Sequence, residues 1–113
     1  DVVYCDGVLY YGNEHSFIKG IDEMYRVLAP KGIARIYTKS DKDVWANSNR
    51  EIAPNNYVVD TGYETGMLIY CPPIKRLRTI LNDFVNITIG IEQFNYLSLD
   101  SIKSFWVVTA EKG

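Results

Sequence analysis

The side chains that could do chemistry are few, and the most prominent are the adjacent phenols of Tyr10 and Tyr11. A phenol has an unperturbed pKa of about 10 and is a poor general base at neutral pH. Its hydroxyl can orient a bound molecule, and its ring face attracts cations. The one histidine, His15, falls in the first turn of a predicted helix, where we expect a surface position. These residues therefore predict positioning of a bound molecule rather than proton abstraction.

The two cysteines, Cys5 and Cys71, are not in a pattern that binds metal. Neither has a C-x-x-C neighbour or a histidine at ligand spacing, so the sequence does not favour a metal site. Two cysteines are also too few for the dense disulfide framework of a small secreted domain. We expect two free, buried thiols.

Length and composition predict one small domain with an aromatic-rich core. The chain has 113 residues, of which 47% are hydrophobic and nine are tyrosine, which excludes a disordered chain. A net charge of −2 predicts no nucleic-acid partner, and the short basic cluster of Lys75, Arg76 and Arg78 is expected to be a solvated helix face. No apolar run reaches the roughly 20 residues of a membrane span. We expect a soluble, cytoplasmic protein with no membrane partner.

A strand, a helix and a second strand must position these side chains. Residues 2–5 form a continuous apolar run, which is typical of a parallel strand buried on both faces. A helix follows with Asn13 as its expected N-cap. Its apolar stripe consists of Phe17, Ile18, Ile21, Met24, Tyr25 and Leu28. Residues 33–38 form the next strand, so this segment predicts a right-handed βαβ unit.

The link between this helix and the second strand reads as a turn. The helix must stop before Pro30, and residues 29–32 have proline second and glycine fourth, as a type I turn prefers. A type I turn would remove any need for positive φ at Lys31.

The middle of the chain has a weaker pattern. Ser40 or Asp41 could cap a short helix that runs through Trp45. Residues 47–66 are polar and irregular, with a turn at residues 54–56, and are expected to form a mobile or substrate-covering segment.

Regular structure returns at residues 72–73, where two prolines open a helix. Its apolar positions are Ile74, Leu77, Ile80, Leu81 and Phe84. Residues 86–95 and 104–109 alternate as strands, and their short connection makes them antiparallel. We expect Trp45 and Trp106 to be packing anchors. The predicted fold class is α/β, with a parallel βαβ unit followed by a helix and a terminal antiparallel hairpin.

Two motifs carry a resemblance to a known family. The first is Gly7-Val8-Leu9-Tyr10-Tyr11, and the second is Arg26-Val27-Leu28-Ala29-Pro30-Lys31-Gly32. They resemble the Gly-Val-Leu-His-His type loop and the Arg-Val-Leu-Lys-Pro-Gly-Gly helix end of class I S-adenosylmethionine-dependent methyltransferases, in the small-molecule, type 11-like group. The step from Ile69-Tyr70-Cys71 to Phe84 is also similar. The resemblance covers nearly the whole chain and implies a Rossmann-like fold.

The resemblance implies S-adenosylmethionine as cofactor and methyl transfer to a small-molecule acceptor. The residues it places beside the methionine part of the cofactor are Cys5, Asp6 and Gly7. The residues it places on the substrate side are Leu9, Tyr10 and Tyr11. The alternative is that each of these is an ordinary core or turn residue, with Tyr10 packed on the first helix.

The same resemblance makes residues 1–113 a single partial domain, the C-terminal half of the fold. In the family, the glycine-rich loop, the ribose-binding acid and the adenine-binding segment come earlier, so we expect them before Asp1. The isolated chain is then expected to be inactive, to bind S-adenosylmethionine negligibly, and to self-associate through the exposed edge of its first strand.

Two other functions stay open. The chain could be a non-catalytic methyltransferase-like remnant or a partner-binding subunit. Methylation of RNA or protein would need a basic groove or an added recognition domain, and neither is visible. Residues 47–66 are expected to influence the choice of acceptor, which the sequence does not identify.

Overall fold

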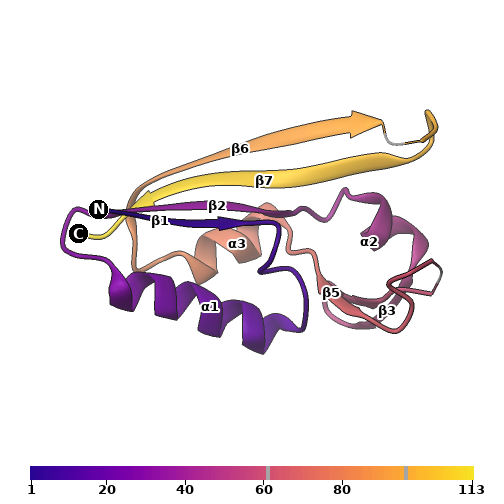
Figure 1. Cartoon of the computed structure of the whole chain (residues 1–113), viewed down its shortest axis with the longest axis horizontal. Helices are drawn as coiled ribbons and strands as arrows, with labels where there is room; N and C mark the ends of the chain where they lie inside the picture. The colour runs from indigo at the N-terminus through magenta and orange to yellow at the C-terminus, as the bar shows by residue number, and fades with distance from the viewer. Residues whose placement is uncertain (61, 96) are drawn as a thin grey trace.

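The computed structural model describes residues 1–60, 62–95 and 97–113. Its main body is a four-stranded mixed sheet in the order β1-β2-β7-β6 (Figure 1). The strands are β1 (Val2–Asp6), β2 (Ile33–Lys39), β6 (Val85–Asn95) and β7 (Ile102–Glu111). β1 is parallel to β2, whereas β7 is antiparallel to both of its neighbours. The predicted parallel pair and terminal hairpin are therefore confirmed.

Helix α1 (Glu14–Val27) connects the two parallel strands, as predicted. The Asn13 side chain accepts a hydrogen bond from Ser16 N at 2.9 Å, and Ser16 Oγ accepts one from Asn13 N at 3.0 Å. This reciprocal cap satisfies two backbone donors that the helix start would otherwise leave unpaired. The apolar stripe of α1 faces the sheet, where its buried residues are Phe17, Ile21 and Met24.

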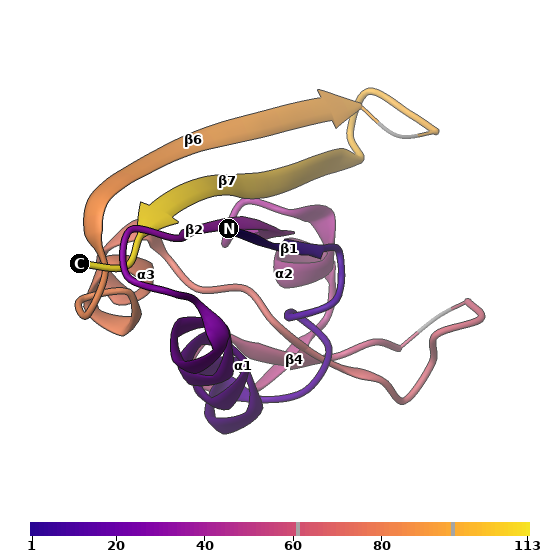
Figure 2. The ribbon, with the colours of Figure 1, turned by 60° about the vertical axis from the view of Figure 1, so that its left-hand side comes forward.

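Helix α3 (Ile74–Ile80) lies on the same face of the sheet as α1 (Figure 2). It begins after Pro73, as predicted, and its Leu77 is fully buried. Trp106 on β7 packs into the same core and donates its indole N–H to Pro72 O at 2.8 Å. Trp106 is thus a packing anchor, as expected. Among the described residues, no helix is long and apolar enough to cross a membrane.

The prediction that β1 is buried on both faces is wrong. Val2 and Tyr4 point to an open face, and Tyr4 is 69% exposed. Val3 and Cys5 point the other way and pack against the core. A continuous apolar run does not distinguish a strand covered on two faces from one covered on a single face. β1 is also an edge of the sheet, with β2 as its one neighbour among the described strands.

The prediction of a type I turn after α1 is also wrong. Gly32 N donates to Ala29 O at 2.8 Å, which closes the turn, but Lys31 has a φ of 68°. A positive φ at the third position marks a type II turn, which usually has glycine there. Lys31 N donates to Lys112 O at 2.7 Å, so the end of β7 helps to hold this conformation.

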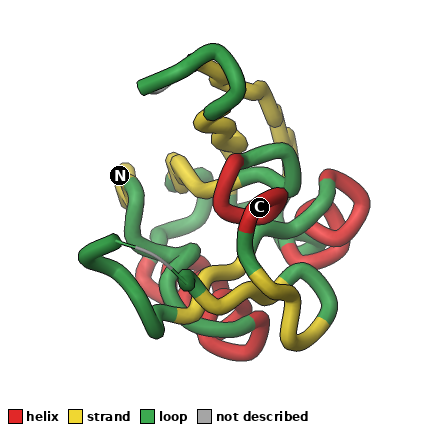
Figure 3. The backbone as a smooth tube through the Cα atoms, turned by 90° about the vertical axis from the view of Figure 1, so that its right-hand side faces the viewer, coloured by secondary structure: helices red, strands yellow, loops and turns green. Residues whose placement is uncertain are grey.

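The expectation that residues 47–66 are irregular fails, because this region contributes two strands to a second sheet. Its strands are β3 (Arg50–Ala53), β4 (Asn56–Val58) and β5 (Leu68–Tyr70), in the antiparallel order β3-β4-β5. The predicted turn is present, with Asn55 at a φ of 62°. Residue 61 of the segment lies outside the described residues. The small sheet and its loops gather at one end of the molecule (Figure 1), the end that faces the viewer in Figure 3.

Helix α2 (Val44–Ser48) precedes the small sheet and is capped by Asp43, not by Ser40 or Asp41 as predicted. The Asp43 side chain accepts a hydrogen bond from Trp45 N at 3.0 Å. The helix therefore starts later than expected and ends three residues beyond Trp45.

The basic cluster on α3 is only partly a solvated face. Lys75 and Arg78 are exposed, but Arg76 forms an ion pair with Glu14 at 2.7 Å. Tyr70 Oη donates to the same carboxylate at 2.6 Å. This cluster joins the start of α1 to α3 and β5.

Candidate functional site

The carboxyl ends of β1 and β2 meet at one edge of the main sheet, and the chain turns sharply there at Gly7. Gly7 has a φ of 72°, a conformation that favours glycine, and its N–H donates to Tyr37 O at 3.0 Å. A β-carbon at Gly7 would lie 3.8 Å from Tyr10 Oη. The exposed Asp6 precedes this position. Gly7 and the Tyr10 hydroxyl thus share one small space at the strand end.

The loop that carries Tyr10 and Tyr11 is held by the small sheet. Tyr70 N donates to Tyr10 O at 2.7 Å, and Tyr11 forms an antiparallel bridge with Ile69. The buried Asn56 donates from its side chain to Ile69 O at 2.8 Å and to the loop at Gly12 O at 3.0 Å. The small sheet, to which the segment of residues 47–66 contributes Asn56, therefore fixes the position of the two phenols.

Tyr10 is buried at the centre of an aromatic cluster. The centre of its ring lies 4.6 Å from that of Tyr11, 6.3 Å from that of Trp45 and 6.5 Å from that of Phe105. These contacts come from the loop after β1, from α2 and from β7. The alternative in which Tyr10 packs on α1 is therefore wrong.

Neither phenol is suited to act as a base. Tyr11 Oη donates to Glu64 Oε2 at 2.8 Å. Burial raises the pKa of Tyr10. Burial also raises the pKa of Tyr11, and the hydrogen bond to Glu64 is the second cause there. Both hydroxyls stay protonated at neutral pH and can donate or accept hydrogen bonds.

A buried ion pair lies beneath this cluster. Lys39 at the end of β2 is 1% exposed, and its Nζ donates to Asp43 Oδ2 at 3.1 Å. The same ammonium lies 4.5 Å from the ring centres of Trp45 and Phe105 and 5.2 Å from that of Tyr10. Burial lowers the pKa of Lys39, and the neighbouring Asp43 carboxylate partly opposes this effect.

Asp43 connects three elements at this position. Besides Lys39, it accepts hydrogen bonds from Trp45 N at 3.0 Å and from Ser104 N at 2.8 Å. Ser40 N donates to Ser104 O at 3.0 Å in the same place. The end of β2, the start of α2 and β7 are therefore joined around one carboxylate.

The cysteines are free thiols, as expected. Cys71 is fully buried against the aromatic cluster, whereas Cys5 is only half-buried beside the main core. Burial raises the pKa of the Cys71 thiol to about 12 and also raises the pKa of Cys5. Within the described residues, no group of three or more His, Cys, Asp or Glu side chains could hold a metal ion.

The other predicted residues are divided between site and core. Leu9 packs on α1, because a β-carbon at Gly20 would come within 2.4 Å of the Leu9 side chain. This position fits the core alternative for Leu9 and explains a glycine inside a helix. His15 is exposed, as expected. Of the predicted substrate-side residues, the structure brings Tyr10 and Tyr11 together and turns Leu9 toward the core.

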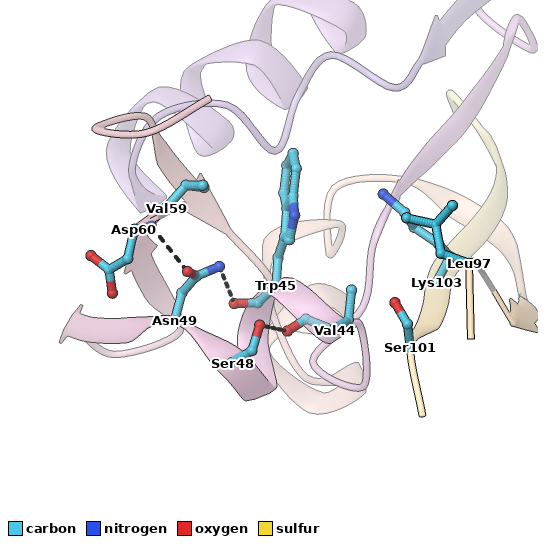
Figure 4. Close-up of a pocket in the computed structure, with 9 residues that line it drawn as sticks. All are labelled: Val44, Trp45, Ser48, Asn49, Val59, Asp60, Leu97, Ser101 and Lys103. Carbon is cyan, nitrogen blue, oxygen red and sulfur yellow. Dashed lines mark hydrogen bonds between the residues drawn. The ribbon is translucent and has the colours of Figure 1, made fainter. Parts of the chain in front are cut away.

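A cavity of about 310 Å³ opens next to the aromatic cluster (Figure 4). It lies between α2, the segment after β4 and the tip of the β6–β7 hairpin. Its lining residues are Val44, Trp45, Ser48, Asn49, Val59, Asp60, Leu97, Ser101 and Lys103. Figure 4 shows the Trp45 ring upright in this cavity, and Lys103 Nζ lies 5.0 Å from the ring centre. Trp45 is thus a wall of the cavity as well as a packing residue.

Sequence reasoning missed Lys39, Asp43 and Asn56, although a signal for the ion pair was present. Lys39 and Asp43 are opposite charges four residues apart, directly after an apolar strand. A charged side chain that continues an apolar strand can be buried if a partner neutralises it. Asn56 gave no such signal, because an asparagine in a turn is ordinary.

Comparisons with known proteins found matches to solved structures alone. No family model matches the chain, and no curated protein sequence does. An S-adenosylmethionine-dependent methyltransferase from Methanosarcina mazei aligns with 98% of this chain and 57% of its own, at a TM-score of 0.61 and 17% identity. The 1,6-didemethyltoxoflavin-N1-methyltransferase of Burkholderia thailandensis aligns with 99% of this chain and 43% of its own, at a TM-score of 0.59 and 16% identity.

A third match is the N-methyltransferase NodS of Bradyrhizobium japonicum, which aligns with 98% of this chain and 45% of its own at a TM-score of 0.53 and 16% identity. The Burkholderia and Bradyrhizobium structures contain S-adenosylhomocysteine. The chain spans about half the length of each of these proteins. Over nearly all of its residues, the chain has the fold of part of the S-adenosylmethionine-dependent methyltransferases.

Proposed function

We propose that residues 1–113 form the C-terminal part of a class I methyltransferase, of the small-molecule type 11-like group, that transfers a methyl group from S-adenosylmethionine. The observation that carries this proposal is the meeting of Gly7, Tyr10 and Lys39 at the carboxyl ends of two parallel strands, in a fold shared with solved methyltransferases. Open parallel sheets bind ligands at that edge. The single domain formed by these residues would then be incomplete without a cofactor-binding half.

The residues at the end of β1 fit the methionine part of the cofactor. Gly7 has no side chain to fill the space beside Tyr10 Oη, and Asp6 presents a carboxylate to solvent. A carboxylate favours the positive charges that S-adenosylmethionine carries. The cofactor would supply an electrophilic methyl group, and Cys5, Asp6 and Gly7 would line its position.

Tyr10 and Tyr11 would orient the acceptor. Both hydroxyls are protonated at neutral pH, and Tyr11 is fixed by its hydrogen bond to Glu64. Holding an acceptor atom in line at about 3 Å from the reacting carbon can supply much of the acceleration without a base. This role needs hydrogen bonding and fixed geometry, which two anchored phenols provide.

A small-molecule acceptor is supported by the size of the neighbouring cavity and by the net charge of the chain. The neighbouring cavity of about 310 Å³ suits a small molecule. The net charge of −2 gives no support to a nucleic-acid substrate. Among the similar structures, the Burkholderia enzyme contains its small-molecule substrate.

The first test is cofactor binding by the protein expressed from its complete reading frame. We expect S-adenosylhomocysteine to bind with a Kd in the range of about 1–100 μM in calorimetry, and residues 1–113 alone to bind negligibly. Binding of comparable strength to residues 1–113 alone would contradict the claim of a partial domain. If the complete protein binds no cofactor, the non-catalytic remnant or partner-binding subunit becomes the better description.

A matched pair of glycine variants locates the site. Gly7 and Gly66 both have positive φ, at 72° and 90°, so replacing either with alanine has a similar backbone cost. Nothing lies near a β-carbon at Gly66, whereas one at Gly7 enters the proposed site. We expect Gly7→Ala to weaken cofactor binding about tenfold and Gly66→Ala to leave it unchanged. Equal effects of the two variants would remove Gly7 from the site.

Activity can then be measured as transfer of a labelled methyl group to a panel of small amines, phenols and carboxylates. We expect Tyr11→Phe to lower turnover without changing cofactor affinity, because the phenyl ring keeps its packing but cannot donate a hydrogen bond.

A further inference from the structure

We propose that Lys39 is a positioning residue of the acceptor side, whose ammonium fixes the rings of Tyr10 and Trp45 in place. That these rings belong to an acceptor side rests on the proposed function, but the placement of the rings by Lys39 can be tested without any methyl transfer.

The contacts of Lys39 are unusual for a lysine. Its amine is almost fully buried, with Asp43 as its ion-pair partner at 3.1 Å. Three aromatic rings lie within 5.2 Å of Nζ, and they belong to Tyr10, Trp45 and Phe105. A cation attracts the face of an aromatic ring, and the attraction is stronger where water is excluded. One ammonium therefore holds side chains from the loop after β1, from α2 and from β7.

Stability alone does not account for this arrangement. Two charges that are taken out of water lose much of their hydration, and well-packed apolar residues at such positions are often as stable or more stable. A buried pair can instead fix a single geometry. Here the geometry concerns the proposed site, because Tyr10 is one of its phenols and Trp45 is a wall of the neighbouring cavity.

The ion pair is joined to the cavity by two routes. Asp43 accepts a hydrogen bond from Trp45 N and one from Ser104 N, which holds β7 against α2. The Lys39 ammonium packs on the Trp45 ring, which also contacts Lys103. Loss of the positive charge at Lys39 would remove the attraction on one wall of the cavity while leaving the backbone hydrogen bonds of Asp43 intact.

The charge state of Lys39 gives a direct readout. The titratable groups that face it are Asp43 from the cap of α2, Lys103 from β7, Cys71 after β5 and Tyr10 after β1. Burial lowers the pKa of Lys39 below its ordinary value of 10.5, so this amine loses its proton at a lower pH than an ordinary lysine. The rings should respond to that step.

The experiment is ¹⁹F NMR of the complete protein labelled with 5-fluorotryptophan. Trp45→Phe and Trp106→Phe each remove one signal and so assign the signals of Trp45 and Trp106. Trp106, which packs away from Lys39 and bonds to Pro72 O, serves as the internal reference. We expect the Trp45 signal alone to shift as the pH rises, with a midpoint below 10.5. Lys39→Met should abolish this shift, whereas Lys42→Met, at an exposed neighbouring lysine, should preserve it.

A Trp45 signal whose pH response survives in Lys39→Met would overturn the proposal. If Lys39→Met does not fold, the signals of Trp45 and Trp106 both lose their folded-state positions, and Lys39→Arg decides the matter. Arginine keeps the charge at all these pH values, so the Trp45 signal should stay near its low-pH position without titrating. A Trp45 signal that still titrates in Lys39→Arg is the second result against the proposal.

The kinetic consequence is tested separately, in a protein shown to transfer methyl groups. We expect Lys39→Met to raise KM for the acceptor about tenfold and to leave cofactor affinity unchanged. The control Lys42→Met should leave both KM and cofactor affinity unchanged. An unchanged KM would mean that the rings held by Lys39 do not contact the acceptor. Absence of any methyl transfer would count against the proposed function and leave the NMR result standing.

Discussion

Lys31 holds a left-handed backbone conformation, with a φ of 68°. This conformation costs a residue with a side chain about 1–2 kcal/mol, which glycine avoids. Glycine in turn loses about 0.5–1 kcal/mol of stability, because its unfolded state has more conformational freedom. We expect Lys31→Gly to raise the free energy of unfolding by about 0.5–1 kcal/mol in urea titrations. Lys31→Ala is the control, because it removes the long side chain but keeps the β-carbon. Equal gains from both variants would show that the backbone conformation is not the cause.

Thr38 has a buried hydroxyl that lacks a hydrogen-bond partner among the described residues. Leaving a polar group buried and unpaired costs about 1–3 kcal/mol. We expect Thr38→Val to stabilise the protein by about 1 kcal/mol, measured as a higher midpoint of urea unfolding. Thr109→Val, at a partly exposed position on neighbouring β7, should change stability little. A destabilised Thr38→Val would show that the hydroxyl has a partner in solution.

A polar link joins Glu14 at the start of α1 to α3 and β5. The hydrogen bonds from Arg76, the larger cause, and from Tyr70 lower the pKa of Glu14 below its ordinary value of 4.5. A carboxylate with a depressed pKa stabilises the fold above pH 4.5, and this contribution is lost as the pH falls through the lower folded-state value. We expect Glu14→Gln to lower stability at neutral pH and to flatten its decline in acid, as followed by urea unfolding from pH 7 to about pH 3.

The control for this prediction lies on the same helix. Glu23 pairs with Arg26 on the exposed surface of α1, where solvent screens the interaction. Glu23→Gln should therefore change stability less at every pH. Parallel pH profiles for wild type and Glu14→Gln would rule out the interhelical carboxylate as a source of the acid sensitivity.

The elements also show what a sequence can predict. The helix α1 has three regular turns of apolar spacing and a clear cap at Asn13, so its position follows from local chemistry. β4 and β5 have three residues each, too few for alternation to be read. Their existence depends on pairing with each other and with the loop at Tyr11. Those are long-range contacts that no local pattern contains.

The site divides in the same way. The location of Gly7 and Tyr10 could be predicted, because strand ends in a parallel sheet share one edge. The burial of Lys39 could be predicted only in part, because its charge partner Asp43 is four residues away in the sequence, whereas the rings of Tyr10 and Phe105 come from distant segments of the chain. The open face of β1 was missed because the apolar residues Val2 and Tyr4 look the same in the sequence whether covered or exposed.

At the scale of the whole molecule, this open face and the edge of β1 predict self-association. Val2 and Tyr4 are exposed on an edge strand, and an edge presents unpaired backbone groups to other chains. We expect residues 1–113 to form concentration-dependent dimers or larger species in sedimentation experiments, and Val2→Lys with Tyr4→Lys to reduce them. Val8→Lys with Val27→Lys, which places charges at exposed positions outside the strands, is the matched control. A monomer at all concentrations would contradict the prediction.

The β6–β7 hairpin extends beyond its last pairing with β2, at Phe105, and its tip forms one wall of the cavity. Leu97 is 91% exposed and Leu99 is 85% exposed, so the tip contributes little to either core. Substitutions there should be nearly neutral for folding, because exposed positions have few contacts to lose. In evolutionary terms, the molecule keeps the residues that make it fold apart from those that shape this wall of the cavity. Selection could therefore change the shape of the cavity repeatedly while the scaffold that carries it stays the same.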